Sequence, residues 1–375
     1  MKYNPFCSTD IQFMTKVEME NELTKITNLN LVLILSDSSA VRWKFHEFIK
    51  MLERKNNLIW ISEVNPNPTQ EDILKTYEKT GLEKIDLIIA IGGGSAIDLA
   101  KGISAFYEYR HHKLTIDIIT SELKDKSYIR KDGFIDILAI PTTAGTGSEI
   151  TEWATIWDIN KNEKFSIDHR KLKPKKTLII PELTLTLSPE LTLSTGLDAL
   201  SHAMEAYWSK HTNPLVQDLA YRSIQLIVDN MLKVLDDPHN LIGRECMCRA
   251  SVLAALAFSH TRTTACHSIS YPMTMLYGVP HGFAVAMTLN EVANKNKGNF
   301  PNDQALFEIF QKFGGIQSWL DIVCGGIVNL KLSGFGISKQ DIDKIVNNSF
   351  TGGRMDNNPI QLSIEDVREM LINIF

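Results

Sequence analysis

LIIAIGGGSAIDLAK (residues 87–101) joins an apolar run to an amphipathic run through three consecutive glycines. The apolar run predicts a buried strand, and the stretch from Ser95 onward predicts a helix. Glycines at such a turn let the backbone approach a ligand, and the first N–H groups of the helix attract an anion. Ser95 and Asp98 have the spacing of a capping arrangement that would fix the start of this helix. The segment therefore predicts a phosphate-binding turn between a strand and a helix, with an ordinary tight turn as the alternative.

The flanking sequence repeats this alternation of apolar and amphipathic stretches. Strands are predicted at residues 29–37, 57–64 and 136–141, and helices at residues 40–54 and after Pro68 and Thr69. Apolar strands separated by helices predict a parallel sheet covered on both faces. From about Ser188 the pattern becomes helical, over residues 194–210, 214–235 and 242–258. We expect an α/β domain over residues 1–185 and an all-α domain over residues 186–375.

Length and composition limit the possible functions. The chain has 375 residues, which fits two domains, and 44% of them are hydrophobic. A formal net charge of -5 gives no reason to expect a nucleic acid or a membrane surface as partner. The opening segment lacks the pattern of a signal peptide, and no run approaches the roughly 20 apolar residues of a membrane span. The 5 cysteines form no CxxC pair, which favours a reduced, cytoplasmic protein.

Four side chains in the second half predict a metal site. Asp198 and His202 lie four residues apart in GLDALSHAMEAY (residues 196–207), so one helix face presents both. His267 and His281 follow further along the chain. One carboxylate and three imidazoles suit a divalent ion such as Fe²⁺, Zn²⁺, Mn²⁺ or Co²⁺ with an open coordination position. Ordinary packed histidines are the alternative, but a charged Asp198 among apolar neighbours is costly unless it is paired or bound to a metal.

A second polar loop and one acidic residue suggest a nucleotide. PTTAGTGSE (residues 141–149) follows a predicted strand, and the hydroxyls of Thr142, Thr143 and Thr146 suit phosphate and ribose oxygens. Asp37 ends another apolar strand, where a carboxylate can bind ribose hydroxyls and repel a 2′-phosphate. Asp37 would then favour NAD over NADP, although a helix-capping or turn aspartate is an equally simple interpretation.

These segments, together with PELTLTLSPELT and YGVPHG, resemble the iron-containing (group III) alcohol dehydrogenase family over most of residues 30–290. The resemblance implies a Rossmann-like α/β N-terminal domain that binds NAD or NADP and an all-α C-terminal domain that holds Fe²⁺ or Zn²⁺. It also implies an active site in the cleft between them and a homodimer or larger homo-oligomer. The implied metal ligands are Asp198, His202, His267 and His281. The implied cofactor-binding residues are Asp37, Gly93, Gly94, Ser95, Asp98, Thr142, Thr143 and Lys164.

One departure from the family concerns catalysis. Many members carry a second histidine at the position of Tyr271, close to the substrate. A phenol has an ordinary pKa near 10, so a proton relay built on imidazole is in doubt here. Tyr271 is therefore a candidate catalytic residue in place of that histidine.

The substrate prediction rests on two further segments. RTTACHSISYP (residues 262–272) and GRMDNNP (residues 353–359) resemble the phosphonoacetaldehyde reductase branch. They carry Arg262 and Arg354, whose guanidinium groups could bind an anionic substrate, although each could instead form a surface ion pair. We expect reduction of a small anionic aldehyde, with phosphonoacetaldehyde to 2-hydroxyethylphosphonate as the leading case. The alternatives are a general short-chain alcohol dehydrogenase, a lyase of the dehydroquinate synthase type and a non-catalytic relative.

Overall fold

The computed structural model describes residues 7–80, 84–111, 113–130, 133–158 and 163–375. The chain divides into two compact units. We call residues 1–143 and 148–184 the α/β unit, and residues 144–147 and 185–375 the helical unit. The break after Thr184 lies next to the boundary predicted from the sequence, but the excursion of residues 144–147 into the helical unit was not predicted.

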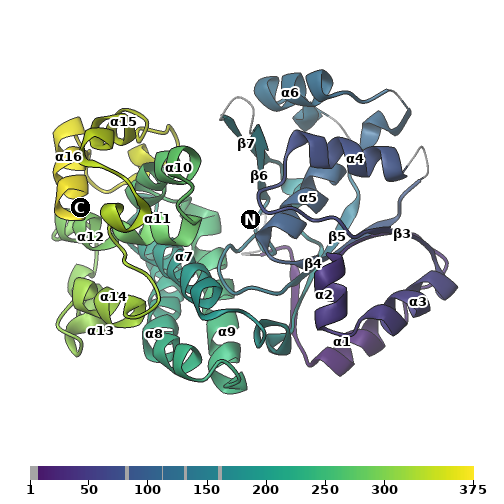
Figure 1. Cartoon of the computed structure of the whole chain (residues 1–375), viewed down its shortest axis with the longest axis horizontal. Coiled ribbons are helices and arrows are strands. Elements are labelled where there is room, and N and C mark those ends of the chain that lie inside the picture. Colours follow the sequence, from purple (N-terminus) through teal and green to yellow (C-terminus); the bar gives the residue numbers. More distant parts are fainter. Residues whose placement is uncertain (1–6, 81–83, 112, 131–132, 159–162) are drawn as a thin grey trace, which may run out of the picture. The chain divides into compact units, whose positions relative to one another are not determined.

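The α/β unit is built on a six-stranded parallel sheet with strand order β1-β8-β5-β4-β2-β3 (Figure 1). The strands are β1 (Asp10–Phe13), β2 (Asn30–Ile34), β3 (Asn57–Ile61), β4 (Leu87–Gly92), β5 (Asp136–Pro141) and β8 (Lys176–Ile179). The helices are α1 (Lys16–Leu23), α2 (Asp37–Arg42), α3 (His46–Lys55), α4 (Gln70–Thr80), α5 (Gly94–Ala105) and α6 (Ile116–Asp125). A separate antiparallel hairpin pairs β6 (Trp153–Asp158) with β7 (Glu163–Asp168).

Both faces of the sheet are buried, as the apolar strands predicted. Successive strand residues point to opposite faces, so Val32 belongs to one core and Leu33 to the other. Helices α4, α5 and α6 cover the first face through residues such as Ile73, and α1, α2 and α3 cover the second through residues such as Met19 (Figure 1). The predicted α/β class is therefore confirmed.

The single helix predicted over residues 40–54 is wrong, because the chain forms two helices there. Helix α2 ends after Arg42, and Lys44 takes a left-handed backbone conformation with φ of 56°. The N–H of Phe45 then donates to the Ala40 carbonyl at 2.9 Å, which closes the turn before α3 begins.

The helical unit consists of helices, with longer connections only before α15 and between α15 and α16 (Figure 1). Its first three helices match the predicted helical stretches, and the rest of the unit confirms the all-α class. The helices are α7 (Pro189–Trp208), α8 (Pro214–Asp236), α9 (Leu241–Thr261), α10 (Ala265–Tyr277), α11 (His281–Met287), α12 (Leu289–Asn296), α13 (Asp303–Gln311), α14 (Ile316–Cys324), α15 (Ile342–Asn347) and α16 (Ile364–Asn373). Within the described ranges, none of the helices has both the length and the apolar character needed to cross a membrane.

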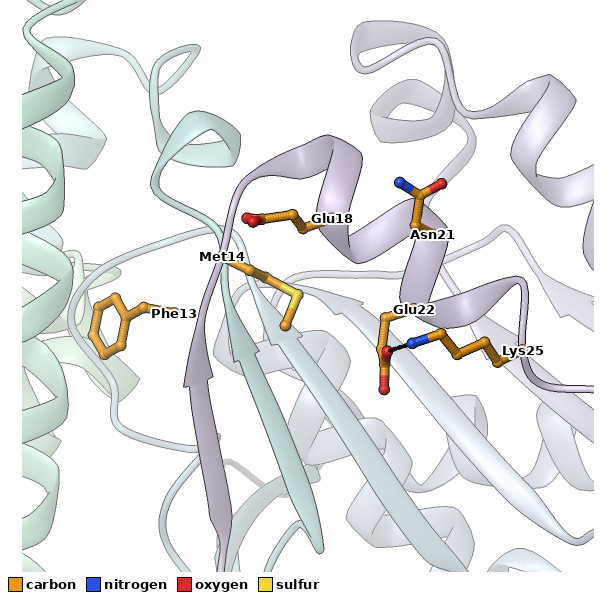
Figure 2. Close-up of a pocket in the computed structure, with 6 residues that line it drawn as sticks. All are labelled: Phe13, Met14, Glu18, Asn21, Glu22 and Lys25. Atoms are coloured by element: carbon orange, nitrogen blue, oxygen red, sulfur yellow. Dashed lines mark hydrogen bonds and ion pairs between the residues drawn. The ribbon is translucent and has the colours of Figure 1, made fainter.

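A hollow of about 370 Å³ lies beside β1 and α1 in the α/β unit (Figure 2). Its walls come from β1, α1 and the segments that follow them, and an ion pair joins Glu22 to Lys25 at 2.5 Å. The six lining residues include none of the predicted metal or cofactor residues. We therefore assign this hollow no part in the candidate active site.

Candidate active site

Helix α7 carries the first two predicted metal ligands. Ser188 caps its first turn by accepting a hydrogen bond from the Leu191 N–H at 3.2 Å, and Pro189 occupies the first helical position. Most of the helix is buried, including Asp198 and His202. Their four-residue spacing places both side chains on one face, where a single ion could contact them.

The structure places each of the three predicted histidine ligands near Asp198, and the ligand atoms of Asp198, His267 and His281 all lie within 4.8 Å of one another. Oδ1 of Asp198 lies 3.8 Å from Nε2 of His202, 3.5 Å from Nε2 of His267 and 3.9 Å from Nε2 of His281. The ring of His202 stacks between Phe258 and His267, with centroid distances of 4.1 and 4.5 Å. Three imidazole nitrogens thus surround one carboxylate oxygen.

These separations fit ligands of a common ion better than direct hydrogen bonds. Nitrogen–oxygen hydrogen bonds usually span about 2.7–3.2 Å, whereas two ligands of a tetrahedral ion with bonds of about 2.1 Å lie about 3.4 Å apart. Oδ1 of Asp198 and Nε2 of His267 are also buried without a hydrogen-bond partner among the described residues. Buried polar atoms without partners are costly, and a divalent ion would satisfy both. The residues present therefore fit a metal site.

The YGVPHG segment positions His281 through its backbone. Gly278 ends α10 in a left-handed conformation with φ of 68°, and Pro280 precedes α11, so that His281 is the first residue of α11. The neighbouring Gly282 lies directly against α7, because a Cβ atom added there would be 1.9 Å from the Ser194 carbonyl oxygen. The glycine therefore allows α11 to approach α7 closely enough for His281 to reach the cluster.

Glu205 is a site residue that the sequence analysis missed. It lies two turns after Asp198 on the same face of α7 and is fully buried. One carboxylate oxygen hydrogen-bonds Nδ1 of His267, and the other accepts from the Thr264 hydroxyl at 2.8 Å and from the His267 N–H at 3.3 Å. A carboxylate behind a metal-binding histidine fixes the ring orientation. A buried glutamate in the apolar segment GLDALSHAMEAY was the available signal.

Burial and the neighbouring charges shift the pKa values of the candidate ligands. Burial lowers the pKa of His202 to about 4, against the attraction of Asp198. Burial also opposes a charge on His267, but Glu205 and Asp198 outweigh it and raise the pKa of His267 to about 10. Burial likewise opposes ionisation of Asp198, yet the surrounding imidazoles hold its pKa below the ordinary value. At neutral pH the metal-free site therefore contains a neutral His202 and a protonated His267.

Metal uptake is expected to release about one proton at pH 7.5, because the ion must displace the proton on His267 but none on His202. The apparent affinity should rise with pH, since the metal and the proton compete up to the His267 pKa of about 10. Isothermal titration of the metal-free protein in two buffers with different ionisation enthalpies measures this release. Uptake without proton release would contradict the assignment of His267 as a ligand.

Of the predicted catalytic residue Tyr271 and the two predicted substrate-binding arginines, two connect to the candidate metal ligands. The ring of Tyr271 lies parallel to that of His281, with centroids 6.1 Å apart. Nε of Arg354 donates to the Tyr271 hydroxyl at 3.4 Å. Arg262 is exposed at the end of α9, with φ of 61° and an extended ψ, a conformation that favours glycine. The structure thus links Arg354 to the cluster and leaves the role of Arg262 a prediction.

In the α/β unit, the start of the second predicted phosphate loop lies beside the first. The Thr142 N–H donates to the Gly92 carbonyl at 3.0 Å, and a Cβ atom on Gly93 would lie 3.3 Å from Oγ1 of Thr143. Helix α5 begins at Gly94 with Gly93 as its N-cap, so the N-terminus of a twelve-residue helix lies within the glycine turn. This is the geometry expected of a phosphate-binding turn.

The capping arrangement predicted for Ser95 and Asp98 is wrong, because the helix has no side-chain cap. Ser95 instead accepts a hydrogen bond from the Asn67 N–H at 3.1 Å. The Asp98 carboxylate accepts from the Ser148 hydroxyl at 2.5 Å and from the Thr155 N–H at 2.9 Å. Asp98 thus joins α5 to the end of the second loop, at Ser148, and to the start of β6, at Thr155.

The remaining predicted cofactor residues lie in three different elements. Asp37 is exposed in the first turn of α2, after Ser36 as N-cap. Lys164 lies in β7, where its amine is 6.0 Å from the ring centroid of Trp157. Thr146 belongs to the excursion of residues 144–147 in the helical unit. Their roles in cofactor binding stay predictions.

Comparison with known proteins gives matches along nearly the whole chain. Residues 15–181 match the iron-containing alcohol dehydrogenase model, and residues 192–375 match the C-terminal model of the Fe-containing alcohol dehydrogenase family. Alcohol dehydrogenase 4 of Schizosaccharomyces pombe is 29% identical over 354 residues, which cover 92% of this chain and 82% of that protein. NADPH-dependent butanol dehydrogenase of Clostridium saccharobutylicum is 32% identical over 277 residues, 73% of this chain and 70% of that protein.

A solved structure shows the same fold. Sulfoacetaldehyde reductase from Bifidobacterium kashiwanohense, in complex with NAD⁺, has a TM-score of 0.84 and 25% identity, and the alignment covers 100% of this chain and 99% of that one. The family models cover both units, and the four candidate ligands converge within the helical unit. The chain therefore belongs to the iron-containing alcohol dehydrogenase family, whose members are oxidoreductases that act on CH–OH groups.

Proposed function

We propose that this family member reduces a small anionic aldehyde to its alcohol with a nicotinamide dinucleotide, and that phosphonoacetaldehyde is its leading substrate. The observation that carries this proposal is the hydrogen bond from Arg354 to Tyr271, whose ring stacks on His281. It places a guanidinium group one side chain away from a candidate metal ligand. A phosphonate or sulfonate can accept two hydrogen bonds from a guanidinium, whereas a neutral aldehyde offers no such group.

The residues divide the chemical work among them. When bound, the ion supplies Lewis acidity to the aldehyde carbonyl and the reduced nicotinamide supplies the hydride. Asp198 and the three histidines hold the ion, and Arg354 orients the anionic end of the substrate. We assign the Tyr271 hydroxyl the task of holding the proton that the product oxygen takes up. The aldehyde thus gains one hydride and one proton and becomes an alcohol.

The cofactor proposal is supported by the loops of the α/β unit. The N-terminus of α5 and the adjoining Thr142 and Thr143 provide backbone and hydroxyl donors suited to a pyrophosphate. Asp37 is the first residue of α2, shortly after β2. Its carboxylate favours NAD because it would repel the 2′-phosphate of NADP. The sulfoacetaldehyde reductase complexed with NAD⁺ supports both the cofactor and an anionic aldehyde. The NADPH-dependent butanol dehydrogenase supports the alternative of a neutral short-chain substrate.

Protein reconstituted without oxygen with Fe²⁺ or Zn²⁺ tests the function. NADH and NADPH oxidation should be followed with phosphonoacetaldehyde, sulfoacetaldehyde and propanal. We expect one NADH to be consumed per aldehyde and a higher kcat/KM for the anionic aldehydes. A preference for propanal would instead identify a general alcohol dehydrogenase. Turnover of a substrate without net NADH oxidation would identify a lyase, and metal binding without turnover would identify a non-catalytic relative.

Arg354→Ala is expected to raise KM for phosphonoacetaldehyde about 10–100-fold, because hydrogen bonds to a charged group are lost. Its KM for propanal should change little, since propanal has no anion to bind. Steady-state kinetics with both aldehydes measure the difference. Equal effects on both substrates would contradict an anion-binding role.

Arg262→Gly provides the comparison at the second predicted arginine. Glycine is the suitable replacement because Arg262 has φ of 61°, where alanine would keep the backbone strain and glycine would relieve it. A KM increase confined to the anionic aldehydes would assign Arg262 to substrate binding as well. Unchanged kinetics would leave Arg354 as the anion-binding residue.

A further inference from the structure

Lys101 is a fully buried lysine in the third turn of α5. Its amine donates to the carbonyl oxygens of Ser148 at 2.7 Å and Trp153 at 2.6 Å. It also lies 3.0 Å from the Ser148 hydroxyl and 3.4 Å from the Thr151 hydroxyl. Lysine is rarely buried completely unless its charge is compensated, so the surrounding acceptors point to a specific task.

The segment that Lys101 holds is where the chain returns to the α/β unit. Residues 144–147 belong to the helical unit, and Ser148 is the first residue back. The other end of this loop, where the chain leaves the α/β unit, is held by the β4–α5 connection, because the Thr142 N–H donates to the Gly92 carbonyl. Both ends of the second predicted phosphate loop are therefore fixed to the segment that forms the first.

Asp98 completes this arrangement one turn before Lys101. The two side chains lie on the same face of α5, and the Ser148 hydroxyl contacts both. The second carboxylate oxygen of Asp98 accepts from the Thr155 N–H in β6. Burial lowers the pKa of Lys101 to about 8, and the nearby Asp98 carboxylate opposes this decrease. The amine thus stays mainly protonated at neutral pH and keeps all its donors.

We infer that Lys101 is a positioning residue for the dinucleotide: it fixes the second phosphate loop, through Ser148 and Trp153, against the glycine turn at the start of α5. This inference rests on the proposed use of NADH or NADPH. Lys101 acts through the loop and not by contact with the cofactor. Its loss should therefore weaken dinucleotide binding while the metal site in the helical unit keeps its four ligands.

The test compares Lys101→Met with Ser104→Ala in the metal-loaded full-length protein. Methionine keeps much of the side-chain volume but removes every donor. Ser104 is the matched control because it is buried in the same helix and also anchors a backbone, through hydrogen bonds with Ile135 at 3.0 and 2.9 Å. Dissociation constants for NADH from fluorescence titration, KM and kcat, metal content and melting temperature are measured for each variant.

Lys101→Met is expected to raise the NADH dissociation constant and KM by about tenfold or more, with kcat at saturating NADH changed far less. Its metal content should equal that of the wild type. Ser104→Ala should lower the melting temperature without changing NADH affinity. An unchanged NADH dissociation constant in Lys101→Met, or an equal increase in both variants, would overturn the inference.

Removing Lys101 alone leaves the Asp98 carboxylate without its nearest cation, which could prevent folding. The double variant Asp98→Asn/Lys101→Met removes both charges and keeps the test decisive, because it too should bind NADH weakly. Wild-type NADH affinity in the double variant would overturn the inference. If the wild-type protein binds neither NADH nor NADPH, the proposed function fails and the inference with it. If the wild-type protein binds the dinucleotide and the variants bind it equally tightly, the inference fails while the proposed function stands.

Discussion

Asp198→Asn is expected to reduce turnover at least about a thousandfold and to leave the purified protein nearly free of metal. The Asp198 carboxylate oxygen lies within 3.9 Å of three imidazole nitrogens and is the only anion among the four candidate ligands. An amide of the same size keeps the packing of α7 but removes the negative charge that holds a divalent ion. Lewis-acid stabilisation is worth several kcal/mol, and each 1.36 kcal/mol corresponds to a factor of ten in rate.

Metal content per chain and aldehyde reduction are the two measurements. Asp218→Asn is the matched control, because it makes the same chemical change on an exposed position of α8. The control should keep both its metal and its activity. An Asp198→Asn protein with normal metal content and normal turnover would show that the four side chains do not form the catalytic metal site.

Glu205→Gln should lower metal affinity about 10–100-fold, the usual effect of losing a carboxylate behind a metal-binding histidine. The buried carboxylate hydrogen-bonds His267 and Thr264, and its charge favours the imidazole orientation that directs Nε2 toward Asp198. Activity should recover substantially at high metal concentration, because Glu205 is not itself a ligand. Competition with a chelator, followed by metal analysis, measures the change.

Glu149→Gln serves as the control for losing a buried carboxylate. Glu149 lies in the α/β unit, and burial raises its pKa to about 7, so glutamine resembles its protonated form. Metal affinity should stay at the wild-type value in this variant. Glu205→Gln protein that binds metal as tightly as the wild type would contradict the role assigned to Glu205.

The sequence predicted those parts of the fold that depend on continuous patterns. β4 and β5 were identified because they are apolar runs next to glycine or proline, and α7 to α9 because their apolar residues recur at helical spacing. β1 and β8 have only 4 residues each, too few to show a period, and polar residues occupy part of both. The helix break at Lys44 was hidden because the apolar residues around it keep helical spacing and lysine gives no sign of a positive φ.

The candidate site was predictable where a residue type itself implies the chemistry. An aspartate and three histidines in suitable spacing indicate a metal, and the structure brings them together. Glu205 and Lys101 were missed because their roles depend on partners distant in sequence, namely His267 at 62 positions and Ser148 at 47. Asp98 was placed in a helix cap because local spacing cannot show that the Ser148 hydroxyl competes for its carboxylate.

The excursion of residues 144–147 means that the two halves of this gene are not independent modules. Gly145 and Gly147 lie against Thr195, Ala255 and Phe258, with room for no side chain at either glycine. A truncated protein ending at Thr184 would carry this tetrapeptide without the helices it packs on, and the complementary fragment would lack the backbone that covers Thr195, Ala255 and Phe258. Chimaeras between relatives should therefore take the tetrapeptide from the donor of the helical half, because its contacts lie in that half.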